Sequence, residues 1–195
     1  METVRAYAAC LLDLPVTRRL AGLSANLRRA ARERGWEADF VSPAALHVTL
    51  AVLDDVDLGL LDPVAAALAQ TARSHPPFRL QLGSVRGGED PDAPRFLHVS
   101  LGQGAELLED LAAELSRALD ALGVAPPPSP PPRVLLARVR RATTPLRELL
   151  RGGEDLGACV LSELVLYRAD RARPDAEPPV VTRVPLVSPR APTGV

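Results

Sequence analysis

Apolar residues recur along this chain with two different spacings. Spacings of three and four residues, which place side chains on one face of a helix, run over 16–34, 60–73 and 106–122. Shorter apolar runs bounded by Gly, Pro, Asp or Ser are typical of strands. The pattern predicts a short helix at 145–150 and strands at 4–12, 44–53, 78–82, 96–101, 134–139, 158–167 and 180–186.

The order of these elements predicts an α+β protein. A first group of strands and helices is followed by a similar second group, which suggests two lobes, each a small sheet backed by helices. Residues 125–132 are nearly all proline, and such a segment is expected to be an extended connector. We take 1–186 as a single domain of two lobes and 187–195 as an unstructured C-terminal tail.

The strand around His47 has the clearest chemical character. Alternation sends His47 and Thr49 to one face and the apolar residues between and beside them to the other. The imidazole and the hydroxyl then lie side by side, about 6 to 7 Å apart along the strand. Such a pair suits an anion, because the imidazole can donate or accept a proton and the hydroxyl can donate a hydrogen bond. An ordinary half-buried strand with a polar face would show the same pattern.

Composition narrows the classes of function. The chain has 195 residues, 47% of them hydrophobic, and a net charge of −1. Because the chain has no block of like charge, any nucleic acid is expected to bind it locally, through an end or as a small fragment. No apolar stretch approaches the ~18 residues that span a bilayer, so no membrane partner is expected. The two cysteines, Cys10 and Cys159, lie in separate apolar runs and are expected to be reduced core residues of a cytoplasmic protein.

Several short blocks in a fixed order carry a resemblance to a known family. They are Leu14-Pro15, the Pro-x-x-Leu-His-x-Thr-Leu block at 43–50, Pro77-Phe78-x-Leu, Pro94-Arg95-Phe96-Leu97, Leu122-Gly123, Leu136-Ala137-Arg138-Val139 and Ser162-Glu163-Leu164-x-Leu166-Tyr167. With these blocks, the chain from 4 to 186 resembles the 2H phosphoesterase superfamily. Within it, the chain is most similar to the bacterial RNA 2′,3′-cyclic phosphodiesterases, also called 2′-5′ RNA ligase-like proteins.

The resemblance implies a fold and a mechanism. Such proteins have two pseudo-symmetric lobes, each a small antiparallel sheet with helices, and each lobe offers one His-x-Thr strand to a central cleft. By resemblance, the first histidine donates a proton to the departing ribose oxygen and the second activates water. Two hydroxyls hold the phosphate, and neither a metal nor another cofactor is needed. His47 and Thr49 match the first motif, and Arg138 matches a supporting phosphate or structural contact.

The second motif departs from the family pattern. In the register of His-x-Thr-Leu-Ala-Arg, this chain has Arg133 in place of the histidine and Leu135 in place of the threonine. Arginine stays protonated near neutral pH and cannot act as a general base. Loss of a positioned base typically costs ~10²- to 10⁴-fold in rate. Two interpretations of Arg133 stay open: it binds phosphate through its charge and two hydrogen bonds, or it simply faces water.

A further His-x-hydroxyl strand, with His98 and Ser100, is a candidate substitute for the missing motif. It lies 51 residues after His47, whereas Arg133 lies 86 residues after His47, which is closer to the family spacing. A substitute role requires His98 to point into the cleft.

The sequence therefore predicts a monomeric RNA 2′,3′-cyclic phosphodiesterase-like protein whose catalysis is impaired or altered. Its expected partner is RNA with a 2′,3′-cyclic phosphate end or a small cyclic nucleotide. The alternative is a catalytically inactive module of the same fold that binds a nucleotide or an RNA end. A third interpretation is a scaffold that binds protein partners through the proline segment at 125–132.

Overall fold

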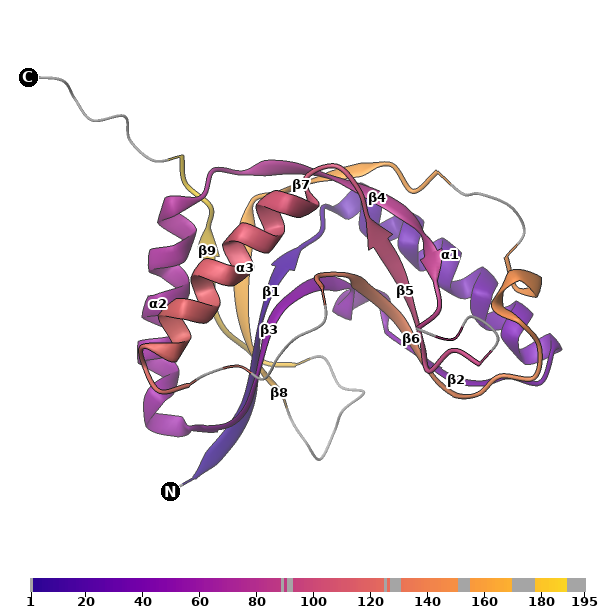
Figure 1. The fold of residues 1–195 in the computed structure, drawn as a ribbon, viewed down its shortest axis with the longest axis horizontal. Coiled ribbons are helices and arrows are strands. Elements are labelled where there is room, and N and C mark those ends of the chain that lie inside the picture. Colours follow the sequence, from indigo (N-terminus) through magenta and orange to yellow (C-terminus); the bar gives the residue numbers. More distant parts are fainter. Residues whose placement is uncertain are drawn as a thin grey trace, which may run out of the picture.

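Antiparallel strands form the body of the protein (Figure 1). The computed structural model describes residues 2–88, 90, 93–124, 126, 131–150, 155–169 and 178–188. Across the sheet the strands follow the order β7-β4-β5-β6-β3-β1-β8-β9, and β2 pairs with β6. Their bounds are β1 (Thr3–Leu11), β2 (Glu37–Phe40), β3 (His47–Asp57), β4 (Phe78–Arg86), β5 (Phe96–Leu101), β6 (Val134–Arg141), β7 (Ala158–Leu161), β8 (Glu163–Ala169) and β9 (Val180–Pro185).

Three helices cover one face of this sheet. Buried residues of α1 (Leu14–Glu33), α2 (Leu61–Ser74) and α3 (Ala105–Asp120) join the same hydrophobic cluster as the inward-facing residues of the strands. The helices α2 and α3 pack against each other and contact β3, β8 and β9, whereas α1 contacts β2 and β7 (Figure 1). The opposite face of the sheet has a small cluster of its own, made by residues of β1 and β8.

The sheet consists of two halves that meet at its middle. One half contains β3, β1, β8 and β9, and the other contains β6, β5, β4 and β7 with β2 alongside. Within the described chain, the strand register between the two halves consists of one residue pair, Val48 with Val134. The predicted α+β fold with two lobes is therefore confirmed, and the two small sheets are joined edge to edge.

The helix α1 forms where the sequence predicted one. The Asp13 carboxylate accepts a hydrogen bond from the Val16 backbone N–H at 2.9 Å, which caps the first turn. Pro15 sits in that turn, where its missing N–H costs nothing. Gly35 follows the last turn with φ of +71°, a conformation that glycine adopts without strain.

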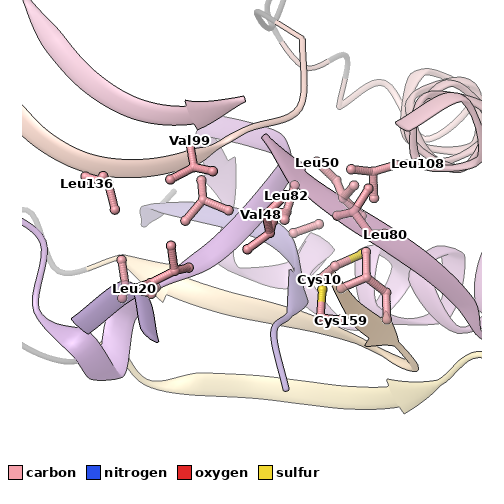
Figure 2. Packing of buried hydrophobic residues seen from close by; sticks show 14 of the residues in the cluster. Cys10, Leu20, Val48, Leu50, Leu80, Leu82, Val99, Leu108, Leu136 and Cys159 are labelled. Atoms are coloured by element: carbon pink, nitrogen blue, oxygen red, sulfur yellow. The ribbon is translucent and has the colours of Figure 1, made fainter. Parts of the chain in front are cut away.

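The core lies between the helices and the sheet (Figure 2). Val48 and Leu50 of β3 point into it together with Val99 of β5, as the alternation of apolar residues predicted (Figure 2). Cys10 and Cys159 are both buried and free, as expected of core cysteines. Burial raises the pKa of both thiols, to about 11 for Cys159, so neither is a reactive thiolate near neutral pH.

Three sequence predictions of secondary structure were wrong. The apolar run at 158–167 is two strands, β7 and β8, which separate at Ser162 and lie in different halves of the sheet. The polar pair Ser162-Glu163 stands at the break, but the run was predicted as one strand because apolar residues lie on both sides of this pair. Residues 37–40 form β2, which was not predicted because the strand has only four residues and two of them, Glu37 and Asp39, are of a type depleted in strands. The predicted helix at 145–150 is a single 3-10 turn, Leu146–Glu148.

Other predictions fall partly on residues outside the described ranges. Of the proline segment at 125–132, residues 125 and 127–130 lie outside them. Residues 189–195 of the predicted tail also lie outside them, and the Val187 backbone N–H donates to the Ala72 carbonyl at 3.1 Å. Among the described helices, none combines the length and the apolar character needed to cross a bilayer.

Candidate active site

Three buried valines determine which residues face the side of the sheet opposite the core. Val134 of β6 pairs with Val48 of β3 and with Val99 of β5, and each valine is 0% exposed. Because side chains alternate along a strand, the residues before and after each valine point to the opposite face. These six residues, all half-buried, are His47, Thr49, His98, Ser100, Arg133 and Leu135. We call them the cleft floor, after the central cleft that the family resemblance implies.

The antiparallel register arranges the cleft floor in two rows across β3, β6 and β5. Taken in that strand order, the rows are His47, Leu135, His98 and Thr49, Arg133, Ser100. Since neighbouring strands lie about 4.8 Å apart, the backbones of His47 and His98 are separated by about 10 Å. The structure thus brings the two predicted His-x-hydroxyl strands to one surface, with the strand that carries Arg133 between them.

His47 lies against two tyrosine rings. Its ring centroid is 5.1 Å from that of Tyr7, with which it stacks, and 5.8 Å from that of Tyr167. The two tyrosines also stack on each other at 5.0 Å, across the β1–β8 pair. Burial lowers the pKa of His47 to about 4, against a smaller opposing effect of its backbone hydrogen bond with Ala45. The imidazole is therefore neutral near pH 7 in the unliganded protein.

His98 stands at the other end of the first row. Its ring centroid lies 5.6 Å from that of Phe96, and Arg86 of β4 is its register partner. Burial lowers the pKa of His98, and the positive charges of Arg133 and Arg86 lower it further. The His98 Nδ1 atom is buried and has no hydrogen-bond partner in the described part of the chain. A ligand on the cleft floor would therefore meet the other ring nitrogen, Nε2.

Arg133 stands in the middle of the second row. Its Cζ lies 4.2 Å from the centroid of the Phe96 ring, a cation–π distance. Burial lowers the pKa of Arg133, and among the described residues it forms no ion pair with a carboxylate. A half-buried guanidinium without an anionic partner loses hydration that it does not recover elsewhere. An anion bound at this point of the cleft floor would supply the missing partner.

The remaining predicted residues, Arg138 and Ser100, have different surroundings. Arg138 is exposed and pairs in register with Phe96, so it lies at the border of the cleft floor, one step beyond the first row. The Ser100 hydroxyl donates to the Ser84 carbonyl at 3.0 Å. Its proton is thus already engaged, which makes Ser100 a poor counterpart of a hydroxyl that donates to phosphate.

Four residues near the site were not among the sequence-predicted ones. Tyr7, Tyr167, Phe96 and Arg86 contact or flank the two histidines. Phe96 carries a signal that the sequence offered, because it stands two residues before His98 on the same strand and so shares its face. The other three reach the histidines only through strand pairing, which no local pattern reveals.

The surroundings of the cleft floor contain two further features. A hollow of about 530 Å³ lies between α1, β4 and the side chains of Leu149, Leu150 and Leu156, and Arg86 is among its lining residues. None of the three histidines, all of them in the described part of the chain, lines it. Within the described ranges, no three His, Cys, Asp or Glu side chains gather in a way that could hold a metal ion.

Comparison with known proteins identifies relatives of this chain. A family model described as LigT-like phosphoesterase matches residues 12–98. An RNA 2′,3′-cyclic phosphodiesterase of Aeropyrum pernix is 30% identical over 157 residues, which cover 77% of this chain and 87% of the relative. A protein of the same name from Aquifex aeolicus is 31% identical over 117 residues, covering 57% of this chain and 61% of the relative.

Solved structures show the same fold at lower sequence identity. TT0787 of Thermus thermophilus superposes with a TM-score of 0.77 at 23% identity, covering 93% of this chain and 97% of that one. LigT of E. coli in its apo form gives a TM-score of 0.73 at 19% identity, covering 96% of this chain and 100% of LigT. Its complex with 3′-AMP gives 0.72 at 18% identity, with the same coverage of both chains.

Proposed function

Because the chain belongs to the LigT-like phosphoesterase family, we propose that it hydrolyses 2′,3′-cyclic phosphates. The substrate would be the end of an RNA or a small cyclic nucleotide, and the product a 2′-phosphomonoester. The departures at Arg133 and Leu135 are expected to alter the second half of the site and to lower the rate. The reaction is proposed to need no metal and to be carried out by a monomer.

The observation that carries this proposal is the position of His47 and Thr49. They stand side by side on the cleft floor, and Arg133 of the neighbouring strand lies next to Thr49. The Thr49 hydroxyl and the Arg133 guanidinium are the donors for the non-bridging phosphate oxygens. Arg138, at the border, would add a further positive charge.

His47 is assigned the role of proton donor to the departing ribose oxygen. Its pKa of about 4 makes it neutral in the unliganded protein. A bound phosphate brings a negative charge next to the ring and favours the imidazolium. His47 would therefore take up its proton together with the substrate and release it to the ribose oxygen when the P–O bond breaks.

The substrate class is supported by charge and by the relatives. Two relatives carry the name RNA 2′,3′-cyclic phosphodiesterase, and LigT of E. coli has been solved with 3′-AMP bound. The net charge of −1 does not suit a long polyanion. The contacts are therefore proposed to be limited to the terminal nucleotide and its phosphate.

A second function is favoured by one observation: Arg133 forms no ion pair with a carboxylate of the described residues. Arginine binds phosphate through two parallel hydrogen bonds but cannot accept a proton from water. If no other group takes that proton, the cleft floor binds a nucleotide or an RNA end without turning it over. In that case the protein is a binding module of the same fold.

The deciding experiment is an assay of cyclic phosphate hydrolysis in the presence of a chelator. Adenosine 2′,3′-cyclic phosphate and a short RNA with that end are incubated with wild type, His47→Ala and His75→Ala. His75 is a matched control, because it is bonded to Glu114 of α3 at 3.0 Å rather than to the cleft floor. We expect turnover in wild type and His75→Ala and loss in His47→Ala. Absence of turnover, with 2′-AMP still bound, would establish the binding module instead.

A further inference from the structure

Two His-x-hydroxyl pairs belong to the cleft floor and come from different strands, His47 with Thr49 on β3 and His98 with Ser100 on β5. Building on the hydrolysis proposed above, we infer that the second half of the active site has moved one strand across the sheet. In this arrangement, His98 of β5 accepts the proton of the attacking water. Arg133, the residue directly before β6, contributes phosphate binding in place of proton transfer.

The strand register places His98 where this role requires it. His98 and His47 stand at the two ends of one row, on the same face of the sheet, with Leu135 between them. Their backbones are about 10 Å apart, two strand spacings. A phosphate resting above Leu135 would have one imidazole on each side. Attack from one side and departure on the other is the geometry that in-line displacement at phosphorus needs.

Arg133 is oriented toward His98 rather than toward His47. Its register neighbour on β5 is Ser100, yet its guanidinium lies over Phe96, four residues away along that strand. The side chain must therefore pass beside His98, which lies between them on the same face. The guanidinium is thereby fixed next to the point where the phosphate would sit, and its charge has no carboxylate partner among the described residues.

The surroundings of the two histidines favour opposite roles. His98 faces Phe96 and the cations Arg133 and Arg86, which favour its neutral form. A neutral imidazole is what accepts a proton from water. His47 faces the uncharged rings of Tyr7 and Tyr167, so no cation opposes its protonation once a phosphate arrives. The charges of Arg133 and Arg86 thus favour His98 as the proton acceptor and leave His47 as the proton donor.

The proposed step is balanced. The water oxygen forms a bond to phosphorus while its proton moves to His98 Nε2. The bond between phosphorus and O3′ breaks, its electron pair stays on O3′, and O3′ takes the proton from His47. The products are a 2′-phosphomonoester and a 3′-hydroxyl. Exchange with solvent then returns His98 to its neutral form, whereas His47, having given up its proton, is already neutral as in the unliganded protein.

A purely structural role for His98 is the competing explanation. A half-buried histidine that packs on Phe96 would contribute to stability and not to the chemical step. The two explanations differ in a rescue experiment. Restoring the family's histidine and threonine by Arg133→His with Leu135→Thr would make His98 dispensable only if His98 has taken over the second histidine's task.

The test compares wild type, His98→Gln, His98→Ala, His47→Ala and the triple variant Arg133→His/Leu135→Thr/His98→Ala. We expect His98→Gln and His98→Ala to lose kcat by at least ~10²-fold while they still bind 2′-AMP and unfold near the wild-type temperature. The triple variant should recover turnover lost in His98→Ala.

Each other outcome has one meaning. If wild type turns over and His47→Ala does not, but both His98 variants keep kcat within a few-fold of wild type, the relocation is overturned and hydrolysis stands. If the loss in His98→Ala follows a loss of folding and His98→Gln is active, the relocation is likewise overturned. If wild type shows no turnover, hydrolysis itself fails, and the relocation fails with it.

Discussion

Arg133 places its guanidinium over the ring of Phe96, with 4.2 Å between Cζ and the ring centroid. This contact couples a residue that departs from the family motif to an aromatic residue on the strand that carries His98. Phe96 therefore does more than fill space, because it determines where the positive charge of Arg133 lies on the cleft floor.

Removing the Phe96 ring should weaken phosphate binding. In Phe96→Leu, Arg133 loses a stacking partner worth about 0.5 to 2 kcal/mol, which corresponds to a rise of about 2- to 30-fold in the Kd for 2′-AMP. Isothermal titration measures the change. Phe40→Leu is the matched control. The Phe40 ring contacts Arg28, with 5.4 Å between Cζ and the ring centroid, and this pair is not part of the cleft floor. An equal loss in both variants would refute a specific role of Phe96.

Removing the Thr49 hydroxyl should affect turnover more than folding. Thr49→Val keeps the shape of the side chain and removes one hydrogen bond to a charged oxygen, worth about 1.5 to 3 kcal/mol. We expect kcat/KM to fall by about 10- to 150-fold and thermal unfolding to change little. Thr182→Val on β9 serves as the control strand hydroxyl. Unchanged kcat/KM in Thr49→Val would mean that this hydroxyl does not contact the phosphate.

The buried imidazole of His47 should make the protein sensitive to acid. Its pKa is about 4 in the folded protein and about 6.5 when unfolded, so between these values the unfolded chain binds more protons. Stability contributed by His47 is then complete above about pH 6.5 and falls as the pH drops, by about 3 kcal/mol below pH 4.

Urea unfolding of wild type and His47→Gln between pH 4 and 7 measures this effect. His98 contributes to the acid sensitivity of both proteins, so the difference between them isolates His47. We expect the two curves of stability against pH to converge at low pH. Parallel curves would show that His47 titrates normally and lies open to water.

Neutralising Arg133 should raise the pKa of His98. In Arg133→Gln, one of the two cations that disfavour the His98 imidazolium is gone, whereas Arg86 and burial remain. Titration of the histidine ring protons by NMR should show the His98 midpoint at a higher pH than in wild type. Arg140→Gln is the control, because Arg140 of the same strand pairs with Asp39 at 2.8 Å. A His98 midpoint that stays in place would mean that Arg133 lies elsewhere.

The part of the site that the sequence revealed is the part that a single strand determines. Alternation around Val48 was enough to place His47 and Thr49 on one face. The relation of His98 to His47 was not accessible in this way. It depends on β6 pairing with both β3 and β5, and on an irregularity of the β5–β6 register between Leu97 and His98. Pairing between strands far apart in the sequence leaves no local pattern.

The same limit explains the errors in the fold. The run at 158–167 was predicted as one strand because β8 is buried on both faces and shows no alternation that would distinguish it from β7, and only the polar pair Ser162-Glu163 interrupts the run. His75, whose neighbours Pro76 and Pro77 are typical of an exposed turn, is half-buried against Glu114 of α3. In both cases the contacting segment is distant in sequence, since β8 pairs with β1 and His75 contacts α3. The burial of each therefore follows from that contact rather than from neighbours in sequence.

The division of the chain between the two halves of the sheet has a consequence for folding. The segment containing β2 lies between β1 and β3 in sequence but pairs with β6, and β8 follows β7 directly yet pairs with β1. No single cut in the polypeptide therefore releases one complete half. Neither half can be made as a separate fragment, and we expect them to gain and lose structure together in one cooperative transition.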